Sequence, residues 1–464
     1  MNRALLVFAA LLLAGCALIK PDYKRPEVEL PAAWKDSAQN PERGKDGSWW
    51  RVYSDPELEK LIAEALAHNA NLQVAAARVD EARALLVQTD ASLYPQVDSR
   101  FGRNRTLSSA ATGLLPPGVQ RERNDYIATV GVSYEVDLWG KLRASSQAAR
   151  ADLLASEAAR ETVRITLSAD VAKTWFALRA LDAEVTSTRR AVGLLEEGLG
   201  LQKKRFDGGV ISEFDYRQLE AEAAATRAQL PPLERDREIQ EAVLAVLLGR
   251  SPKSIMEDAI VRAAEDGGAA LSPAVVPEGL PSELLLRRPD LVEAEERLIA
   301  ANARIAAARA AIFPSIMLTG YAGSEAQALT ALFTGPAGIW QLGFSIAGAI
   351  FDAGRREAQV DAARAREQQL LAAYQGAIQN AFREVRSALA TQSRARESYD
   401  IETARATALV SALRLSRLRY QNGLASQLDV IDAERNLLAA VNSRHEALRA
   451  QRSAVADLYK ALGG

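Results

Sequence analysis

A glycine-centred turn occurs twice in this chain, and its repetition constrains the fold more than any other feature of the sequence. Glycine readily ends a helix, the serine three residues later can cap the next helix, and an acidic residue lies in that helix's first turn. Such a turn predicts a hairpin of two helices. The matching residues are Phe206, Gly209, Ser212 and Asp215 in the first copy, and Tyr420, Gly423, Ser426 and Asp429 in the second.

A second match extends the repetition beyond the turns. Tyr94-Pro95 recurs as Phe313-Pro314 at nearly the same separation. Internal similarity on this scale predicts a tandem duplication in which both copies share one architecture. We therefore expect a first repeat at 56–249, a Gly- and Pro-rich linker at 250–281 and a second repeat at 282–464.

The hydrophobic period on both sides of each turn is helical. Apolar residues keep coiled-coil spacing, and a helix from Lys141 to Phe206 would extend ~100 Å at 1.5 Å per residue. Because this length exceeds that of a compact domain, the sequence predicts long antiparallel coiled-coil pairs. The expected long helices are 141–206, 212–230, 355–420 and 426–462.

Between the helices the hydrophobic period changes to two, which is typical of strands. From Tyr126 to Leu138 apolar residues alternate with mostly polar ones, over more than the ~10 residues that a tilted strand needs to cross a bilayer. Most such alternation comes from soluble hairpins with one buried face, but an isolated two-stranded hairpin is marginally stable. The predicted strands are about 95–105, 126–138, 314–323 and 339–350.

These strands predict an assembly of several chains. Four strands per chain cannot close a barrel, and open edges in lipid would leave backbone groups without partners. Three chains would supply twelve strands, a number suited to a membrane barrel. The predicted fold class is therefore mainly α with membrane β.

The first residues have the features of a targeting signal. Arg3 precedes an apolar run that is shorter than the ~20 residues a membrane helix needs. The run ends in Leu13-Ala14-Gly15-Cys16, which resembles the bacterial lipobox, and Ala17 after it implies the outer membrane. We expect a signal peptide at 1–15 and an acylated extended strap at 16–55. The alternative is an ordinary signal peptide with an incidental cysteine.

Composition argues against nucleic acid binding and against catalysis. The net charge is -2, which gives no reason to expect a nucleic acid partner. His68 and His445 lie far apart, and the only cysteine is assigned to lipid, so no catalytic pair or metal cluster is predicted. Gly208-Gly209 joins helix to helix, unlike a phosphate-binding loop. We expect no enzyme, no metal and no cofactor except the covalent N-acyl diglyceride on Cys16.

The chain resembles the TolC-like outer membrane factor family, and within it the lipoprotein (NodT-type) branch of drug and metal efflux channels. Beside the lipobox and the turns, the most specific matches are Trp49-Trp50, Asp55-Pro56-Glu57-Leu58 and Leu286-Arg287-Arg288-Pro289-Asp290. The resemblance implies a trimer in which two β-hairpins per tandem-repeat protomer form a twelve-stranded outer membrane barrel. It also implies that the coiled-coil helices form a periplasmic tunnel.

The resemblance further implies a gate at the periplasmic end of the tunnel. Asp429 and Asp432 match acidic residues of a constriction, and Tyr420 matches a tyrosine that holds the mouth shut against an aspartate, matched here by Asp215. Some members carry an arginine where this chain has Ala425. Carboxylates from three chains would form a ring that favours cations. The alternative is that the two aspartates only compensate for the helix dipole, as most first-turn acids do.

From these features we predict a passive, gated conduit of a tripartite efflux system for small molecules, either drugs or metal ions. The expected partners are two further copies of the chain, a periplasmic adaptor (membrane fusion) protein, an inner membrane pump of the resistance-nodulation-division type and outer membrane lipid. One alternative is the outer channel of a protein secretion system, which shares the fold. Another is a lipid-anchored coiled-coil scaffold without a pore, although lipid-facing strands would have no use there.

Overall fold

The computed structural model describes residues 23–27, 48–109, 111, 120–257, 260–262 and 287–464. The predicted signal peptide, Cys16 and most of the strap and linker therefore lie outside the described residues. The chain forms two compact units. Unit 1 comprises Met1–Glu27, Arg78–Glu157 and Glu293–Gln375, and unit 2 comprises Val28–Ala77, Ala158–Val292 and Gly376–Gly464.

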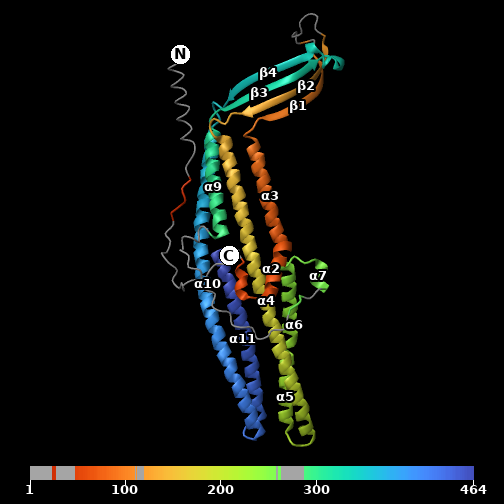
Figure 1. Cartoon of the computed structure of the whole chain (residues 1–464), viewed down its shortest axis with the longest axis vertical. Coiled ribbons are helices and arrows are strands. Elements are labelled where there is room, and N and C mark those ends of the chain that lie inside the picture. The colour runs from red at the N-terminus through yellow and green to blue at the C-terminus, as the bar shows by residue number, and fades with distance from the viewer. Residues whose placement is uncertain (1–22, 28–47, 110, 112–119, 258–259, 263–286) are drawn as a thin grey trace. The chain divides into compact units, whose positions relative to one another are not determined.

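Helices predominate, and the strands occur in two hairpins (Figure 1). The boundary between the units falls inside helices α3, α4, α9 and α10, each of which contributes residues to both. The elements are η1 (Trp49–Tyr53), α2 (Pro56–His68), α3 (Ala70–Ala91), β1 (Gln96–Leu107), β2 (Glu122–Glu135), α4 (Lys141–Asp207), α5 (Glu213–Arg227), α6 (Leu230–Leu247), α7 (Pro252–Glu257), α9 (Pro289–Ala310), β3 (Ser315–Ala326), η2 (Leu329–Ala331), η3 (Gly335–Ala337), β4 (Gly338–Ala347), α10 (Arg355–Gln421) and α11 (Gln427–Leu462).

Unit 1 contains a four-stranded antiparallel sheet in the order β1-β2-β3-β4 (Figure 1). β1 and β2 form one hairpin, β3 and β4 form the other, and β2 pairs with β3 across the two repeats. The register aligns Val97, Val132, Gly320 and Leu342 in one row across the sheet. In the described part of the chain, the outer edges of β1 and β4 have no strand partner.

The two faces of this sheet differ in polarity, as the alternation in the sequence predicts. One face carries large apolar side chains that are solvent-exposed in the single chain; Trp340 is 75% exposed and Phe344 is 70% exposed. A soluble hairpin would bury such a face. The apolar face includes Val97, Phe101, Val130, Val132, Leu318, Trp340, Leu342, Phe344 and Ile346. The other face includes Gln96, Asp98, Arg100, Asn104, Thr129, Ser133, Thr319, Gln341 and Ser345.

β2 occupies Glu122–Glu135 rather than the predicted 126–138. It begins earlier because residues 122–125 pair with residues 104–107 of β1. It ends earlier because Asp137 belongs to the start of α4: its carboxylate accepts the backbone N–H groups of Leu142 and Arg143 at 3.0 and 2.9 Å.

The ends of the other strands also depart from the predicted ranges. β1 continues to Leu107 and β3 to Ala326, past the expected 105 and 323, whereas β4 ends at Ala347 rather than at 350. The pairing of neighbouring strands sets these ends, because a residue stays extended as long as its backbone groups find partners. Hydrophobic alternation alone does not report that pairing.

The two longest helices, α4 and α10, each contain 67 residues and end at the twin turns. At 1.5 Å per residue each extends about 100 Å, the length expected from the sequence. No helix in the ranges that the structure describes combines the length and hydrophobicity needed to cross a membrane.

The helix predicted at 212–230 is α5, which ends at Arg227, and a further helix, α6, follows after a brief interruption at 228–229. Pro231 and Pro232 lie in the first turn of α6 and so begin a helix that runs on to Leu247. Proline is tolerated there because the first N–H groups of a helix have no intrahelical partner. The proline pair therefore lies at the start of this helix.

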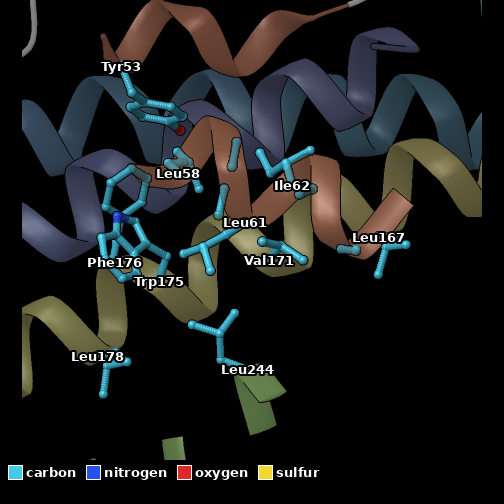
Figure 2. Packing of buried hydrophobic residues seen from close by; sticks show 14 of the residues in the cluster. Tyr53, Leu58, Leu61, Ile62, Leu167, Val171, Trp175, Phe176, Leu178 and Leu244 are labelled. Atoms are coloured by element: carbon cyan, nitrogen blue, oxygen red, sulfur yellow. The ribbon is translucent and has the colours of Figure 1, made fainter. Parts of the chain in front are cut away.

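A large apolar cluster lies in unit 2, where η1 and α2 pack with α4, α6 and α11 (Figure 2). Leu58, Ile62 and Leu178 have no exposed surface, and Trp175 is 2% exposed. The Trp175 indole donates a hydrogen bond to Asp55 Oδ2 at 2.8 Å, while the other oxygen of that carboxylate caps the N-terminus of α2. The Asp55-Pro56 start of the first repeat is thus tied to the core.

Arg288 forms a second buried anchor in unit 2. Its guanidinium lies 2.6 Å from an Asp290 carboxylate oxygen and 2.8 Å from Glu384, and it donates to the Ala461 carbonyl at 3.0 Å. The charged guanidinium can be buried because both of its terminal nitrogens donate to an acceptor. The Arg287-Arg288-Pro289-Asp290 segment therefore fixes the C-terminal end of α11.

Replacing Gly249 by alanine is expected to destabilise unit 2 by more than the ~1–2 kcal/mol of a left-handed residue. Gly249 has φ 73°, and a Cβ there would lie 2.2 Å from the His68 carbonyl oxygen, so the backbone must move. Thermal unfolding of the purified protein measures the loss. Gly376→Ala in α10 is the matched control: a Cβ meets nothing within 4 Å, and a gain of ~0.5–1 kcal/mol is expected. Equal behaviour of the two variants would contradict the assigned clash.

Lowering the pH is expected to stabilise the packing of α4 against α11 near Glu184. Burial, and then the Glu446 carboxylate, raise the pKa of Glu184 to about 7, against a partial opposing effect of Arg449. Between the ordinary carboxyl pKa and about 7 the folded state holds a proton that the unfolded chain has lost, so stability falls as pH rises through that window. Asp236 of α6 lines the same small cavity.

Glu184→Gln is therefore expected to raise the melting temperature at pH 8 and to leave it almost unchanged at pH 5. Melting curves at both pH values, beside Glu81→Gln in α3 as an exposed control, measure the effect. A gain of equal size at both pH values would mean that the titration of Glu184 is not its source.

Candidate functional site

The twin turns of unit 2 have the same backbone hydrogen bonds. In the first, Gly209 N–H donates to Phe206 O at 2.8 Å and Val210 N–H donates to Arg205 O at 2.8 Å. In the second, Gly423 and Leu424 make the corresponding bonds to Tyr420 and Arg419 at 3.0 and 2.8 Å. Both glycines are left-handed, with φ 72° and 71°. This arrangement is a Schellman motif, which glycine favours.

Each turn is followed by a serine-capped helix. Asp215 N–H donates to Ser212 Oγ at 3.2 Å, and the Ser212 hydroxyl donates to the Asp215 carboxylate at 2.7 Å. Ser426 and Asp429 form a complete capping box, in which the Asp429 carboxylate accepts the Ser426 backbone N–H at 2.7 Å. The repeated turn of the sequence is therefore a repeated structure at both hairpin tips.

Tyr420 links the two hairpins. Its hydroxyl oxygen accepts hydrogen bonds from Gln202 Nε2 at 2.9 Å and from Arg205 Nη1 at 3.1 Å. Gln202 is 6% exposed, and its amide also donates to Gln427 Oε1 at 3.1 Å. Below this polar cluster Leu195, Leu219, Ala223 and Ile431 pack together. Near its tip the first hairpin is thus joined to the second by hydrogen bonds from Gln202 and Arg205 and by a small apolar cluster.

The aspartates singled out in the sequence have local partners. Hydrogen bonds from the Ser426 backbone and hydroxyl lower the pKa of Asp429, so this carboxyl stays ionised to lower pH than an ordinary aspartate. Asp432 lies 3.7 Å from Arg435, which also binds Glu222 at 2.9 Å. Asp429 and Asp432 are both exposed in the single chain.

Tyr420 and Asp215 are both near the tips, but within the protomer Tyr420 bonds to Gln202 and Arg205, and Asp215 bonds to Ser212. The Tyr420–Asp215 contact implied by the resemblance is therefore not among the hydrogen bonds of this single chain's described residues. The contact of Tyr420 with Asp215, which lies on the other hairpin, stays a prediction.

Sequence reasoning missed Gln202, Arg205 and Gln427. A signal for Arg205 was present, since Arg205 and Arg419 occupy the same position relative to the two turn glycines. Gln202 has no such signal: the corresponding residue of the second repeat is Ser416. Only the packing of one hairpin against the other identifies Gln202 as a bridge.

A groove of about 1210 Å³ lies between the two hairpins in unit 2. Its lining contains eight arginines but only three carboxylate residues, Asp182, Glu222 and Glu434. Arg262 binds Asp182 and Glu241 at 2.5 and 2.7 Å, and Arg417 binds Glu434 at 2.6 Å. The groove is therefore a concave surface with an excess of positive charge. Across the described ranges, no three His, Cys, Asp or Glu side chains gather as a metal site.

Comparison with known proteins places this arrangement in a family. The family model described as "Outer membrane efflux protein" matches residues 61–250 and 280–464, most of both repeats. The chain belongs to the outer membrane efflux protein family. The resemblance inferred from the turns, the Trp-Trp pair and the Arg-Arg-Pro-Asp segment is thereby confirmed.

Relatives of this outer membrane efflux protein span nearly its whole length. The cation efflux system protein CusC of Escherichia coli (strain K12) is 33% identical over 461 residues, covering 98% of this chain and 97% of CusC. The antibiotic efflux pump outer membrane protein ArpC of Pseudomonas putida is 35% identical over 473 residues, covering 100% and 96%.

A solved structure extends the likeness to three dimensions. The open state of the Neisseria gonorrhoeae MtrE outer membrane channel matches with a TM-score of 0.84 and 33% identity, covering 96% of this chain and 98% of MtrE. The predicted fold class, helical tunnel elements with membrane β-hairpins, is that of outer membrane channels. This chain is an outer membrane efflux channel, and the family is one of conduits rather than of enzymes.

Proposed function

We propose that three copies of this chain form the passive exit duct of a tripartite efflux system. The single observation that carries the proposal is the sheet of unit 1, which has one exposed apolar face and two unpaired outer edges in the described chain. In lipid every backbone group needs a partner, so β1 of one copy must pair with β4 of another. Three copies close a barrel of twelve strands with a polar interior.

The duct is anchored in the outer membrane by an N-acyl diglyceride on Cys16. The lipobox-like sequence before Cys16 supports this modification. Tyr23 and Arg25 of the strap both bind Glu295 of α9, with the Arg25 fork at 2.6 and 2.5 Å. The strap therefore has a defined attachment a few residues after the acylated cysteine.

The periplasmic end closes through the hairpin tips. Asp429 and Asp432 lie at the start of α11 and are exposed in the single chain. Around a three-fold axis these positions would bring six carboxylates together. Gating consists of the separation of the two hairpins, and the Gln202 bridge to Tyr420 and Gln427 is one of the contacts that hold them together within a protomer. A contact of Tyr420 with Asp215, on the other hairpin, would hold the closed mouth further.

An inner membrane pump, of the resistance-nodulation-division type, and a periplasmic adaptor supply the energy and the connection. The groove between the hairpins fits the adaptor, since a helical hairpin can lie in a groove between two others. Its excess of arginines favours an adaptor surface rich in Asp and Glu.

The cargo consists of small molecules, and the printed names of relatives span two kinds. CusC belongs to a cation efflux system and ArpC to an antibiotic efflux pump. An acidic constriction favours cationic cargo of either kind, whether metal ions or positively charged drugs. Protein secretion, the alternative that shares the fold, has no comparable support among these features.

The experiment that tests the proposal is single-channel recording of the purified, acylated protein in planar bilayers. Discrete, cation-preferring conductance steps from trimers are the expected result. Correctly inserted protein that does not trimerise would contradict a trimeric duct. Trimers that show no conductance even when Gln202→Ala with Tyr420→Phe removes the tip contacts would contradict a gated duct. Cross-linking before reconstitution establishes the number of chains in each channel.

A further inference from the structure

Two arginines interrupt the apolar face of the sheet near one end. In β1 that face presents Val97 and Phe101 and then Arg103 and Arg105. The strand register settles their orientation, because Arg103 lies opposite Tyr126 and Arg105 opposite Asn124, in the same alternating set as Val130 and Val132. The two guanidinium groups therefore stand at the margin of the surface that contacts lipid.

This margin belongs to the end of the sheet away from the helices. α3 enters β1 just before Gln96, and β2 leads into α4 just after Glu135, at the same end. Arg103 and Arg105 lie near the opposite end, where β1 turns back to β2. If the helices form the periplasmic tunnel, as proposed above, this end faces the outer leaflet; the inference rests on that function.

The contacts of both arginines keep them on the lipid-facing side. Arg103 Cζ lies 5.5 Å from the centroid of the Tyr126 ring, and its Nη2 donates to Asn124 Oδ1 at 3.4 Å. Arg105 pairs with Glu122, yet its side chain is 64% exposed. Both side chains therefore stay accessible from the surroundings, and their Cα atoms are about 7 Å apart along the strand.

A cation in this place has a specific use. Long basic side chains at the edge of a lipid-facing surface place their charge at the level of the headgroups. Arginine binds phosphate through two parallel hydrogen bonds, and clusters of basic residues recognise anionic lipid headgroups. In the outer leaflet of a bacterial outer membrane the abundant phosphate is carried by glycolipid.

We infer that Arg103 and Arg105 form a binding site for the phosphate of a phosphorylated glycolipid in the outer leaflet. The acyl chains of the bound lipid lie along Phe101 and Val130, while Tyr126 supports the Arg103 guanidinium from the side. Glu122 limits the affinity, because it occupies part of the Arg105 fork.

The test measures diphosphoryl lipid A bound to detergent-solubilised trimers by native mass spectrometry. Arg103→Gln with Arg105→Gln is expected to lower the affinity by about tenfold or more, because two charge-assisted contacts are removed. Arg100→Gln is the matched control: Arg100 lies on the same strand but on the opposite, polar face, opposite Thr129. Glu122→Gln is expected to raise the affinity by freeing Arg105.

Two further measurements separate the possible outcomes. Inorganic phosphate in large excess should displace little lipid A, and lipid A without phosphate should bind weakly; equal binding of the phosphate-free lipid would overturn the inference. Single-channel conductance of the same preparations reports on the duct itself. If the Arg103/Arg105 variant binds lipid A as wild type does and conducts normally, the lipid site alone is overturned. If the wild-type protein shows no conductance, the proposed channel is overturned.

Discussion

Channels of the Asp429→Asn/Asp432→Asn variant are expected to lose their preference for cations and to show a larger conductance than wild type. In a trimer the two positions supply up to six carboxylates, and two unit charges ~6 Å apart repel by roughly 3 kcal/mol at an effective dielectric of about 20. Such a ring attracts cations and excludes anions. The reversal potential in a salt gradient across a planar bilayer measures the selectivity directly.

Asparagine is preferred to alanine here because Asp429 has a structural role. Its carboxylate accepts the Ser426 N–H in the capping box, and losing that cap costs ~1 kcal/mol. Asparagine keeps an acceptor in place while removing the charge. The exposed pair Asp80→Asn/Asp361→Asn, on α3 and α10, serves as a control with the same change in charge. Unchanged selectivity in the tip variant would place the constriction elsewhere and leave both aspartates as capping residues.

Trp175→Ala is expected to produce the largest loss of stability, about 3–5 kcal/mol, because it removes a large buried ring. Trp175 is 2% exposed, packs with α2 and α6 in the unit 2 cluster (Figure 2), and donates to Asp55 at 2.8 Å. The melting temperature and the protease resistance of the purified protein measure the loss.

Two further substitutions separate packing from hydrogen bonding at this site. Trp175→Phe keeps a ring but removes the N–H donor to Asp55, so a loss of roughly 1–3 kcal/mol is expected. Met256→Ala changes an apolar residue that is 83% exposed on α7, and a change within ~0.5 kcal/mol is expected. A Trp175→Ala loss as small as that of Met256→Ala would show that the cluster does not hold unit 2 together.

The sequence predicts the long helices well because their determinants are local. A 3.6-residue period sustained over many turns needs no knowledge of the partner, and Gly209 and Gly423 end α4 and α10 through their own backbone freedom. Prediction from the sequence fails where a segment distant in the chain sets the end of an element. The ends of β2 depend on β1 and on Asp137, whose carboxylate accepts the first N–H groups of α4.

The candidate site divides in the same way. Ser212 and Ser426 each cap a helix by accepting the N–H of a residue three positions later. Both hairpin tips can therefore be predicted from the sequence. The partners of Tyr420 come from a helix more than two hundred positions earlier, and only packing of one hairpin on the other brings Gln202 and Arg205 to its hydroxyl. Arg205 could be found by aligning the two repeats, because Arg419 occupies the matching position. Gln202 could not, because its counterpart is Ser416.

The sequence by itself determined the duplication, the long helices, the capped turns and the alternating strands, because each arises from residues a few positions apart. Tertiary structure decided the register that puts Arg103 opposite Tyr126, the bridge from Gln202 to Tyr420 and the burial of Arg288. These depend on contacts between segments distant in the chain. Their free energy comes from surfaces and hydrogen-bond partners that exist only once both segments are in place.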